Sequence, residues 1–130
     1  MKLNLKNTRV ENLRLQSKED VTEDEFSFNF SDGYSADPED TSFIVKFDLN
    51  IESVHGFEVA LSFIGEFETD CPPSDEFKKS QFPVVNAPAI AYPYLRAFVS
   101  TLTLNSGYEP LMLPTVNFQA LAKRKAEQSQ

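Results

Sequence analysis

The sequence predicts an α+β domain, a four-stranded antiparallel sheet followed by two C-terminal helices packed on one of its faces. Apolar and polar residues alternate through long stretches between residues 10 and 67, as expected of strands with one buried face. An apolar segment with helical spacing follows at residues 87–104, and a shorter helical segment follows that one. Strands first and helices afterwards indicate that the helices cover the apolar face of the sheet.

Four segments carry the strand pattern, and short polar connections separate them. The segment 17–25 (SKEDVTEDE) is dense in charge and predicts a solvated turn, and His55-Gly56 predicts a hairpin turn. Asp32-Gly33 indicates a turn or a bulge, and Gly65 indicates a bulge. The inward-facing residues are expected to be Val10, Leu13 and Leu15; Phe26, Phe28 and Phe30; Phe43, Val45, Phe47, Leu49 and Ile51; and Phe57, Val59, Leu61 and Phe63.

The opposite face of the sheet is predicted to be wet and acidic, because charged residues fill the alternate positions of the third and fourth strands. The acidic residues expected to form a partner-binding surface there are Asp48, Glu52 and Glu58.

The first helix is predicted to begin after Asn86, a favourable N-cap, with Pro88 in its first turn. It is apolar nearly all round: one stripe comprises Leu95, Phe98, Val99 and Leu102, and the other side carries Tyr94, Ala97, Thr101 and Leu104. Such a helix is buried on two sides. One side is expected to pack on the sheet. The other side either packs on another subunit, with Tyr94, Phe98, Thr101 and Leu102 at the interface, or is buried because the helix is the central core helix of one domain.

An apolar loop joins the two helices. Asn105-Ser106-Gly107 carries the residues that end a helix, and the loop then runs from Tyr108 to Val116 with two prolines that exclude helix. Three consecutive apolar residues, 111–113, cannot all face one core, and loops this apolar usually bind something. The last helix starts at Phe118, and its late Lys123-Arg124-Lys125 triplet is expected to complement the helix dipole and to be solvated.

Composition narrows the functional classes. At 130 residues the protein is expected to form one domain, residues 1–130. The net charge of −8 argues against nucleic acid and anionic membranes as main partners. A lone cysteine, Cys71, indicates a reducing compartment. The N-terminus has no continuous apolar signal region and no segment is long enough to span a bilayer, so a soluble cytoplasmic protein without membrane insertion is expected.

The residues required for most catalysis are missing. His55 is the single histidine, and with Cys71 it makes neither a metal site nor a nucleophile–base pair with an orienting group. No phosphate-binding loop or hydrolase motif is present. We therefore expect no enzyme activity, no metal and no cofactor.

The C-terminal half carries a series of short motifs, in order Asn86-Ala87-Pro88-Ala89-Ile90, Tyr92-Pro93-Tyr94-Leu95-Arg96, Gly107-Tyr108, Leu111-x-Leu113 and Val116-Asn117-Phe118-x-Ala120-Leu121. In these motifs it resembles the SecB family of bacterial export chaperones. The resemblance implies a holdase for unfolded polypeptides that assembles as a dimer of dimers. It also implies a client groove between the second strand and the loop joining the helices, where this sequence places Phe26, Phe28, Phe30, Tyr108, Leu111, Leu113 and Val116.

The resemblance also implies contact with the translocation motor SecA through a Leu-x-Glu motif on the wet face of the fourth strand. The corresponding positions here are Glu58 and Ala60, and the sequence ends in KRKAEQSQ where an acidic tail is usual. A relative dedicated to an antitoxin is therefore an alternative to an export chaperone. Two further alternatives are an adaptor that binds one folded partner through its acidic face and a pocket for an apolar small molecule between sheet and loop.

Overall fold

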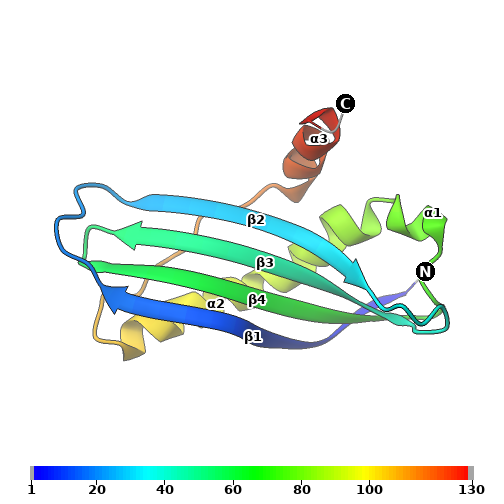
Figure 1. Cartoon of the computed structure of the whole chain (residues 1–130), viewed down its shortest axis with the longest axis horizontal. Helices are drawn as coiled ribbons and strands as arrows, with labels where there is room; N and C mark the ends of the chain where they lie inside the picture. Colours follow the sequence, from blue (N-terminus) through cyan, green and yellow to red (C-terminus); the bar gives the residue numbers. More distant parts are fainter. Residues whose placement is uncertain (1, 129–130) are drawn as a thin grey trace.

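The computed structural model describes residues 2–128, which form a two-layer α+β structure. The antiparallel sheet has the strand order β1-β4-β3-β2, so the first and last strands along the sequence are neighbours. The long helix α2 lies across one face of the sheet, and α3 stands beyond the β2 edge (Figure 1). The elements are β1 (Leu3–Ser17), β2 (Glu25–Tyr34), β3 (Ser42–Ser53), β4 (Phe57–Thr69), α1 (Asp75–Lys78), the π-helix η1 (Phe82–Asn86), α2 (Ala87–Asn105) and α3 (Phe118–Gln128).

The predicted fold class is confirmed, although the strands are longer than the alternation indicated. β2 continues through Asp32-Gly33, where a turn or bulge was expected, because Gly33 and Tyr34 pair with Ile44 and Phe43 of β3. A Cβ atom at Gly33 would lie 3.0 Å from the side chain of Ile44. The glycine therefore permits close packing beside β3 rather than ending the strand.

The sequence predicted a bulge at Gly65, but Gly65 does not mark a bulge in its own strand. β4 pairs with β3 without interruption through Gly65, and the two register shifts lie in β1, between Leu5 and Asn7 and between Val10 and Asn12. A Cβ atom at Gly65 would be 3.0 Å from the Cβ atom of Ala91. This glycine and Ala91 are thus a point where the backbone of the sheet and helix α2 approach each other tightly.

The core lies between the sheet and α2. All the predicted inward-facing residues of β3 and β4 are buried. On α2 the buried stripe runs through Ala91, Leu95 and Val99, whereas Phe98 and Leu102 of the predicted stripe are only half-buried on its flank. The small residue Ala91 must face Gly65, and this contact sets the rotation of the helix about its axis.

The sequence predicted the end of α2 correctly but not the N-cap at its start. Asn86 makes no side-chain cap, because the backbone is already helical in η1 and the backbone N–H of Asn86 donates to the carbonyl of Gln81. The predicted stop is correct: Gly107 has φ of +93°, and the N–H groups of Gly107 and Tyr108 donate to the carbonyls of Leu104 and Thr103. This is the Schellman arrangement that a left-handed glycine permits.

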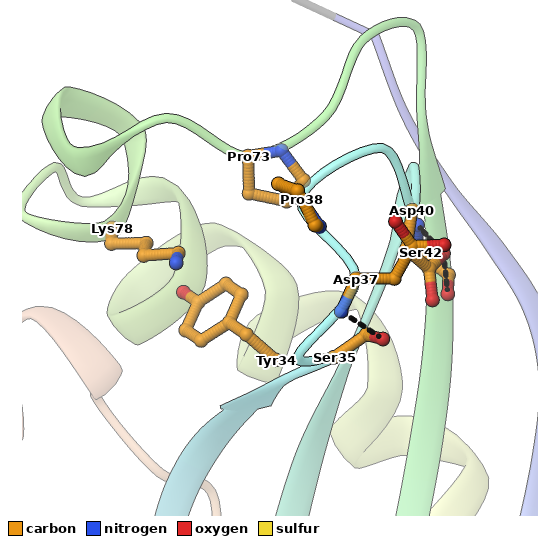
Figure 2. Close-up of a pocket in the computed structure, with 8 residues that line it drawn as sticks. All are labelled: Tyr34, Ser35, Asp37, Pro38, Asp40, Ser42, Pro73 and Lys78. Carbon is orange, nitrogen blue, oxygen red and sulfur yellow. Dashed lines mark hydrogen bonds between the residues drawn. The ribbon is translucent and has the colours of Figure 1, made fainter.

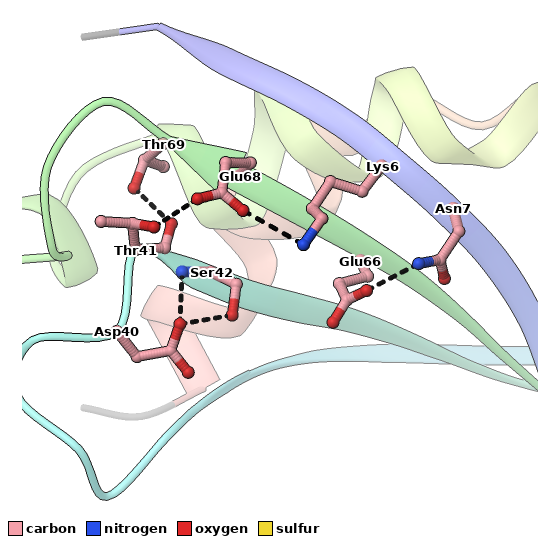
Figure 3. Close-up of polar contacts among 8 residues, drawn as sticks. All are labelled: Lys6, Asn7, Asp40, Thr41, Ser42, Glu66, Glu68 and Thr69. Carbon is pink, nitrogen blue, oxygen red and sulfur yellow. Dashed lines mark hydrogen bonds and ion pairs between the residues drawn. The ribbon is translucent and has the colours of Figure 1, made fainter.

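Polar contacts secure the end of the sheet near the β2–β3 loop. The Thr41 hydroxyl donates to Glu68, and Lys6 Nζ lies 3.3 Å from the same carboxylate (Figure 3). These two contacts, in that order of importance, hold the pKa of Glu68 below its usual value. On the other side of the loop, Tyr34 donates to Asp32 and Lys78 Nζ lies 4.7 Å from the centre of the Tyr34 ring.

Next to Tyr34 the structure leaves a hollow of about 30 Å³, also bordered by the loop and by Pro73 (Figure 2). This volume suits about one water molecule and no larger ligand. Among residues 2–128, no helix combines the length and apolar character needed to cross a lipid bilayer.

Candidate functional site

The segment between α2 and α3, residues 108–117, is irregular and is called the connector below. Helix α2 holds it through two hydroxyl groups: Thr103 Oγ1 accepts from the backbone N–H of Leu111 at 2.9 Å, and the Tyr92 hydroxyl donates to the carbonyl of Pro114 at 2.6 Å. Leu113 lies between these bonds and is buried. The connector is therefore fixed along one flank of α2 and does not move freely in solvent.

An aromatic cluster ties the start of α3 to the sheet. The ring of Phe118 lies 5.3 Å from Phe30, 5.5 Å from Tyr92 and 6.2 Å from Phe28, in edge-on contacts. Asn117 caps the helix, because its Oδ1 accepts from the backbone N–H of Ala120 at 3.0 Å. These contacts set where α3 leaves the sheet and leave part of β2 uncovered.

A groove opens between that part of β2 and the connector, and we call it the β2–connector groove. It encloses about 420 Å³. Three of the predicted client-binding residues meet in its walls: Phe26, which is 38% exposed, and Phe28 and Val116, which are half-buried. The other lining residues are Pro114, Thr115, Asn117, Leu121 and Arg124.

The remaining predicted client-binding residues lie elsewhere. Phe30 and Leu113 are buried in the core, and Leu111 is half-buried on the flank of α2. Tyr108 is half-buried, with its ring centre 4.4 Å from that of Phe57, and it borders a second hollow at the opposite end of the connector. That hollow is lined by His55, Leu104, Gly107, Tyr108, Glu109 and Pro110.

Strand β2 forms an edge of the sheet, so its outer side has no strand partner among residues 2–128. The carbonyl of Phe30 accepts from Lys125 Nζ, which also lies 4.0 Å from the centre of the Phe30 ring. Burial lowers the pKa of Lys125, against an opposing effect of Asp32. Every second residue of an antiparallel strand directs its backbone groups to the same side, so those of Phe26 and Phe28 also face outwards.

The residues of the predicted acidic surface do share the polar face of the sheet. Glu52 and Glu58 are directly opposite each other in the pairing of β3 and β4, and Lys18 forms ion pairs with both. Asp48 accepts a hydrogen bond from the Ser62 hydroxyl at 2.7 Å. A lysine therefore already offsets part of the negative charge of this surface.

The outer face of α2 is apolar and exposed. Tyr94 is 54% exposed, Thr101 is exposed, and Phe98 and Leu102 are half-buried. Tyr94, Phe98 and Thr101 border an open hollow with Val10 of β1. Three of the four predicted interface residues thus border one surface with the β1 edge.

No group of histidine, cysteine and acidic residues in the described part of the protein is arranged to hold a metal ion. The groove offers apolar contact, and the outer side of β2 offers backbone hydrogen bonding.

Sequence reasoning missed four residues that shape the site: Tyr92, Thr103, Asn117 and Arg124. Two of them carried a usable signal. Asn117 is a favourable cap directly before the predicted helix, and it shares the spacing i, i+4, i+7 with Leu121 and Arg124, which predicts one helix face. Thr103 and Tyr92 gave no such signal, because their partners Leu111 and Pro114 lie in an irregular segment.

A family model matches most of the chain. The family described as preprotein translocase subunit SecB matches residues 15–129. The protein-export protein SecB of Afipia carboxidovorans is 33% identical over 78 residues, covering 57% of this chain and 47% of that protein. The one from Magnetococcus marinus is 28% identical over 115 residues, covering 82% and 69%. The chain spans about half the length of several such relatives, including 49% of the Anaplasma marginale protein.

A solved structure shares the fold. The SecB-like chaperone of Mycobacterium tuberculosis, in complex with a ChAD peptide from the HigA1 antitoxin, superposes with a TM-score of 0.65 at 17% identity. The match covers 88% of this chain and 90% of that one. At this identity the likeness establishes the fold, including the antiparallel sheet with its helices.

Proposed function

The chain belongs to the SecB family, and from that premise we propose that it is a molecular chaperone that holds unfolded polypeptide segments in the β2–connector groove. The observation that carries the proposal is the groove itself, an open hollow lined by five apolar and three polar residues beside an edge of β2 that no other strand of residues 2–128 covers. Exposed apolar patches on a folded domain are typical of binding sites. The activity is binding without a chemical step, so we place the protein among cytoplasmic holdases and not among enzymes.

Two features of the groove suit a client without a fixed shape. Phe26, Phe28 and Val116 supply apolar contact that depends little on the sequence of the client. The outward backbone groups of Phe26 and Phe28 can pair with an extended segment as an added strand. Tyr108 and Leu111 extend the apolar path along the connector, and Phe30 and Leu113 support the walls from the core.

We further propose that the protein acts as a homo-oligomer, a dimer of dimers. A helix face that exposes Tyr94 and Leu104 is costly to leave in water, and a second copy would cover it. The proposed interface comprises Tyr94, Phe98, Thr101 and Leu102, next to the β1 edge. Light scattering at micromolar concentration tests this assembly, and a population of monomers alone would contradict it.

The client set distinguishes two forms of the proposal. The names of the curated relatives favour protein export, and the peptide bound to the M. tuberculosis chaperone favours a dedicated antitoxin client. Contact with the SecA motor would use the polar face, where Glu58 and Ala60 stand in place of the family motif. A purely electrostatic adaptor acting through Asp48, Glu52 and Glu58 is less well supported, because Lys18 pairs with two of these carboxylates.

A pair of matched variants tests the groove. Phe26 and Phe82 are 38% and 37% exposed, and each stacks on one phenylalanine neighbour, Phe28 and Phe77 respectively. Phe26 lines the groove and Phe82 does not. We expect Phe26→Ser to weaken suppression of aggregation of a denatured client and Phe82→Ser to leave it unchanged. Equal effects of the two changes would show that the groove is not the holding site.

A further inference from the structure

Helix α3 carries three consecutive basic residues, and the structure gives two of them distinct positions beside the groove. Lys125 is held over the ring of Phe30 and donates to its carbonyl. Arg124 lines the β2–connector groove. The triplet was expected to be a solvated helix end; all three residues are exposed, and Arg124 also lines the groove.

Arg124 is the one charged residue among those that line the groove. Its side chain is exposed, and it forms no ion pair with any other residue in the range 2–128. By contrast, Lys18, which follows β1, and Lys46 of β3 are paired with glutamates. Within residues 2–128, this arginine of an acidic protein thus has no ion-pair partner at the place where a bound segment would pass.

A guanidinium in this position has a specific chemical preference. It offers planar donors that match a carboxylate in a two-pronged contact. The neighbouring apolar walls, Leu121 and Val116, would exclude water from one side of such a pair. The net charge of −8 repels acidic segments at long range, but this repulsion is screened beyond about 10 Å at 0.1 M salt. Within the groove, the nearby guanidinium of Arg124 then favours a segment that carries a carboxylate.

We propose that Arg124 binds a carboxylate of the client, so that the groove prefers an apolar segment that adjoins an acidic side chain or a free C-terminal carboxylate. The proposal rests on the proposed function, since it requires that a client segment occupies the groove. It adds a chemical preference that apolar contact alone does not supply.

Short labelled peptides test the preference by fluorescence anisotropy. Each has the same alternating phenylalanine–serine core and an amidated end, and they differ only in a terminal Glu, Gln or Lys. We expect the Glu peptide to bind about two- to fivefold more tightly than the Gln peptide, the range for an exposed ion pair. The advantage should disappear at high salt. A Gln peptide with a free α-carboxylate reports whether a free terminus serves as well as an acidic side chain.

Variants on the same helix supply the controls. We expect Arg124→Gln to abolish the advantage of Glu over Gln, so that the variant binds these two peptides equally. Arg124→Glu should reverse the order and favour the Lys peptide. Lys123 is exposed and does not line the groove, so Lys123→Gln should keep the wild-type order.

The outcomes separate this inference from the proposed function. If all three amidated peptides bind the wild-type protein equally, Arg124 does not select carboxylates, although the holdase function stands. If Lys123→Gln reduces the preference as much as Arg124→Gln, a diffuse helix charge is responsible and the specific site is refuted. If no peptide binds, both proposals fail.

Discussion

Replacing Thr103 by valine should loosen the connector without disturbing helix α2. Thr103 is fully buried, and its hydroxyl donates to the carbonyl of Val99 at 2.9 Å and accepts from the N–H of Leu111 at 2.9 Å. Valine has nearly the same shape as threonine but has no hydroxyl to accept a hydrogen bond. The N–H of Leu111 then loses its partner, whereas the carbonyl of Val99 stays within the backbone hydrogen bonding of the helix.

The magnitude follows from the burial of that N–H group. An unsatisfied buried donor costs about 1–3 kcal/mol, and Leu111 is half-buried, which favours the lower part of this range. A loss of about 1–2 kcal/mol in the free energy of unfolding corresponds to a fall in Tm of roughly 4–8 °C for a protein of this size. Client holding should also weaken, because the connector forms one wall of the groove.

Thermal unfolding and amide hydrogen exchange check this prediction together. Thr103→Val should lower Tm and speed exchange at Leu111 more than at residues within α2. The matched control is Thr101→Val, the same change on the exposed face of the same helix, which keeps that face apolar and should alter stability by less than about 0.5 kcal/mol. Equal Tm values for the two variants, with unchanged exchange at Leu111, would refute the role given to Thr103.

Three further predictions concern packing, pH and assembly. Gly65→Ala should destabilise the fold by about 1–3 kcal/mol in urea unfolding, because its Cβ would meet Ala91 at 3.0 Å, and adding Ala91→Gly should recover part of the loss. The hydrogen bond from Gln16 is the main cause that lowers the pKa of Glu58 from 4.5, so the ionised carboxylate stabilises the fold above pH 4.5. This stabilisation is lost as the pH falls through the folded-state pKa. Glu58→Gln should therefore flatten that part of a plot of stability against pH, and an unchanged plot would contradict the prediction. Tyr94→Arg should shift the mass measured by light scattering to a smaller assembly, and an unchanged mass would remove this residue from the interface.

Local patterns in the sequence predicted most of the fold. The alternation correctly predicted the inward residues of β3 from Phe43 to Ile51 and of β4 from Phe57 to Phe63, because a strand with one buried face leaves a period of two in its sequence. The pairing of β1 with β4 could not be predicted in this way, since alternation says which face is buried but not which strand lies alongside. The function of Gly65 was missed for a similar reason, because its partner Ala91 lies on a different element.

The sequence predicted which segments form the candidate site better than it predicted which of their residues are exposed there. Phe26, Phe28 and Phe30 share one face of β2, as their spacing requires, but Phe118 covers Phe30 and leaves Phe26 exposed. That difference depends on where α3 leaves the sheet. Within the connector, Leu113 is buried and Met112 is 70% exposed, which confirms that the consecutive apolar residues do not all face one core.

Site-specific photo-crosslinking tests the central claim, that unfolded segments bind between β2 and the connector, most directly. A photoreactive amino acid at Thr115, which is exposed and lines the groove, is compared with one at Asn12, which is exposed on β1 at the opposite edge of the sheet. Binding in the groove predicts adducts with a denatured client from position 115 and few from position 12. Crosslinks from Asn12 alone, or equal yields from both positions, would contradict it.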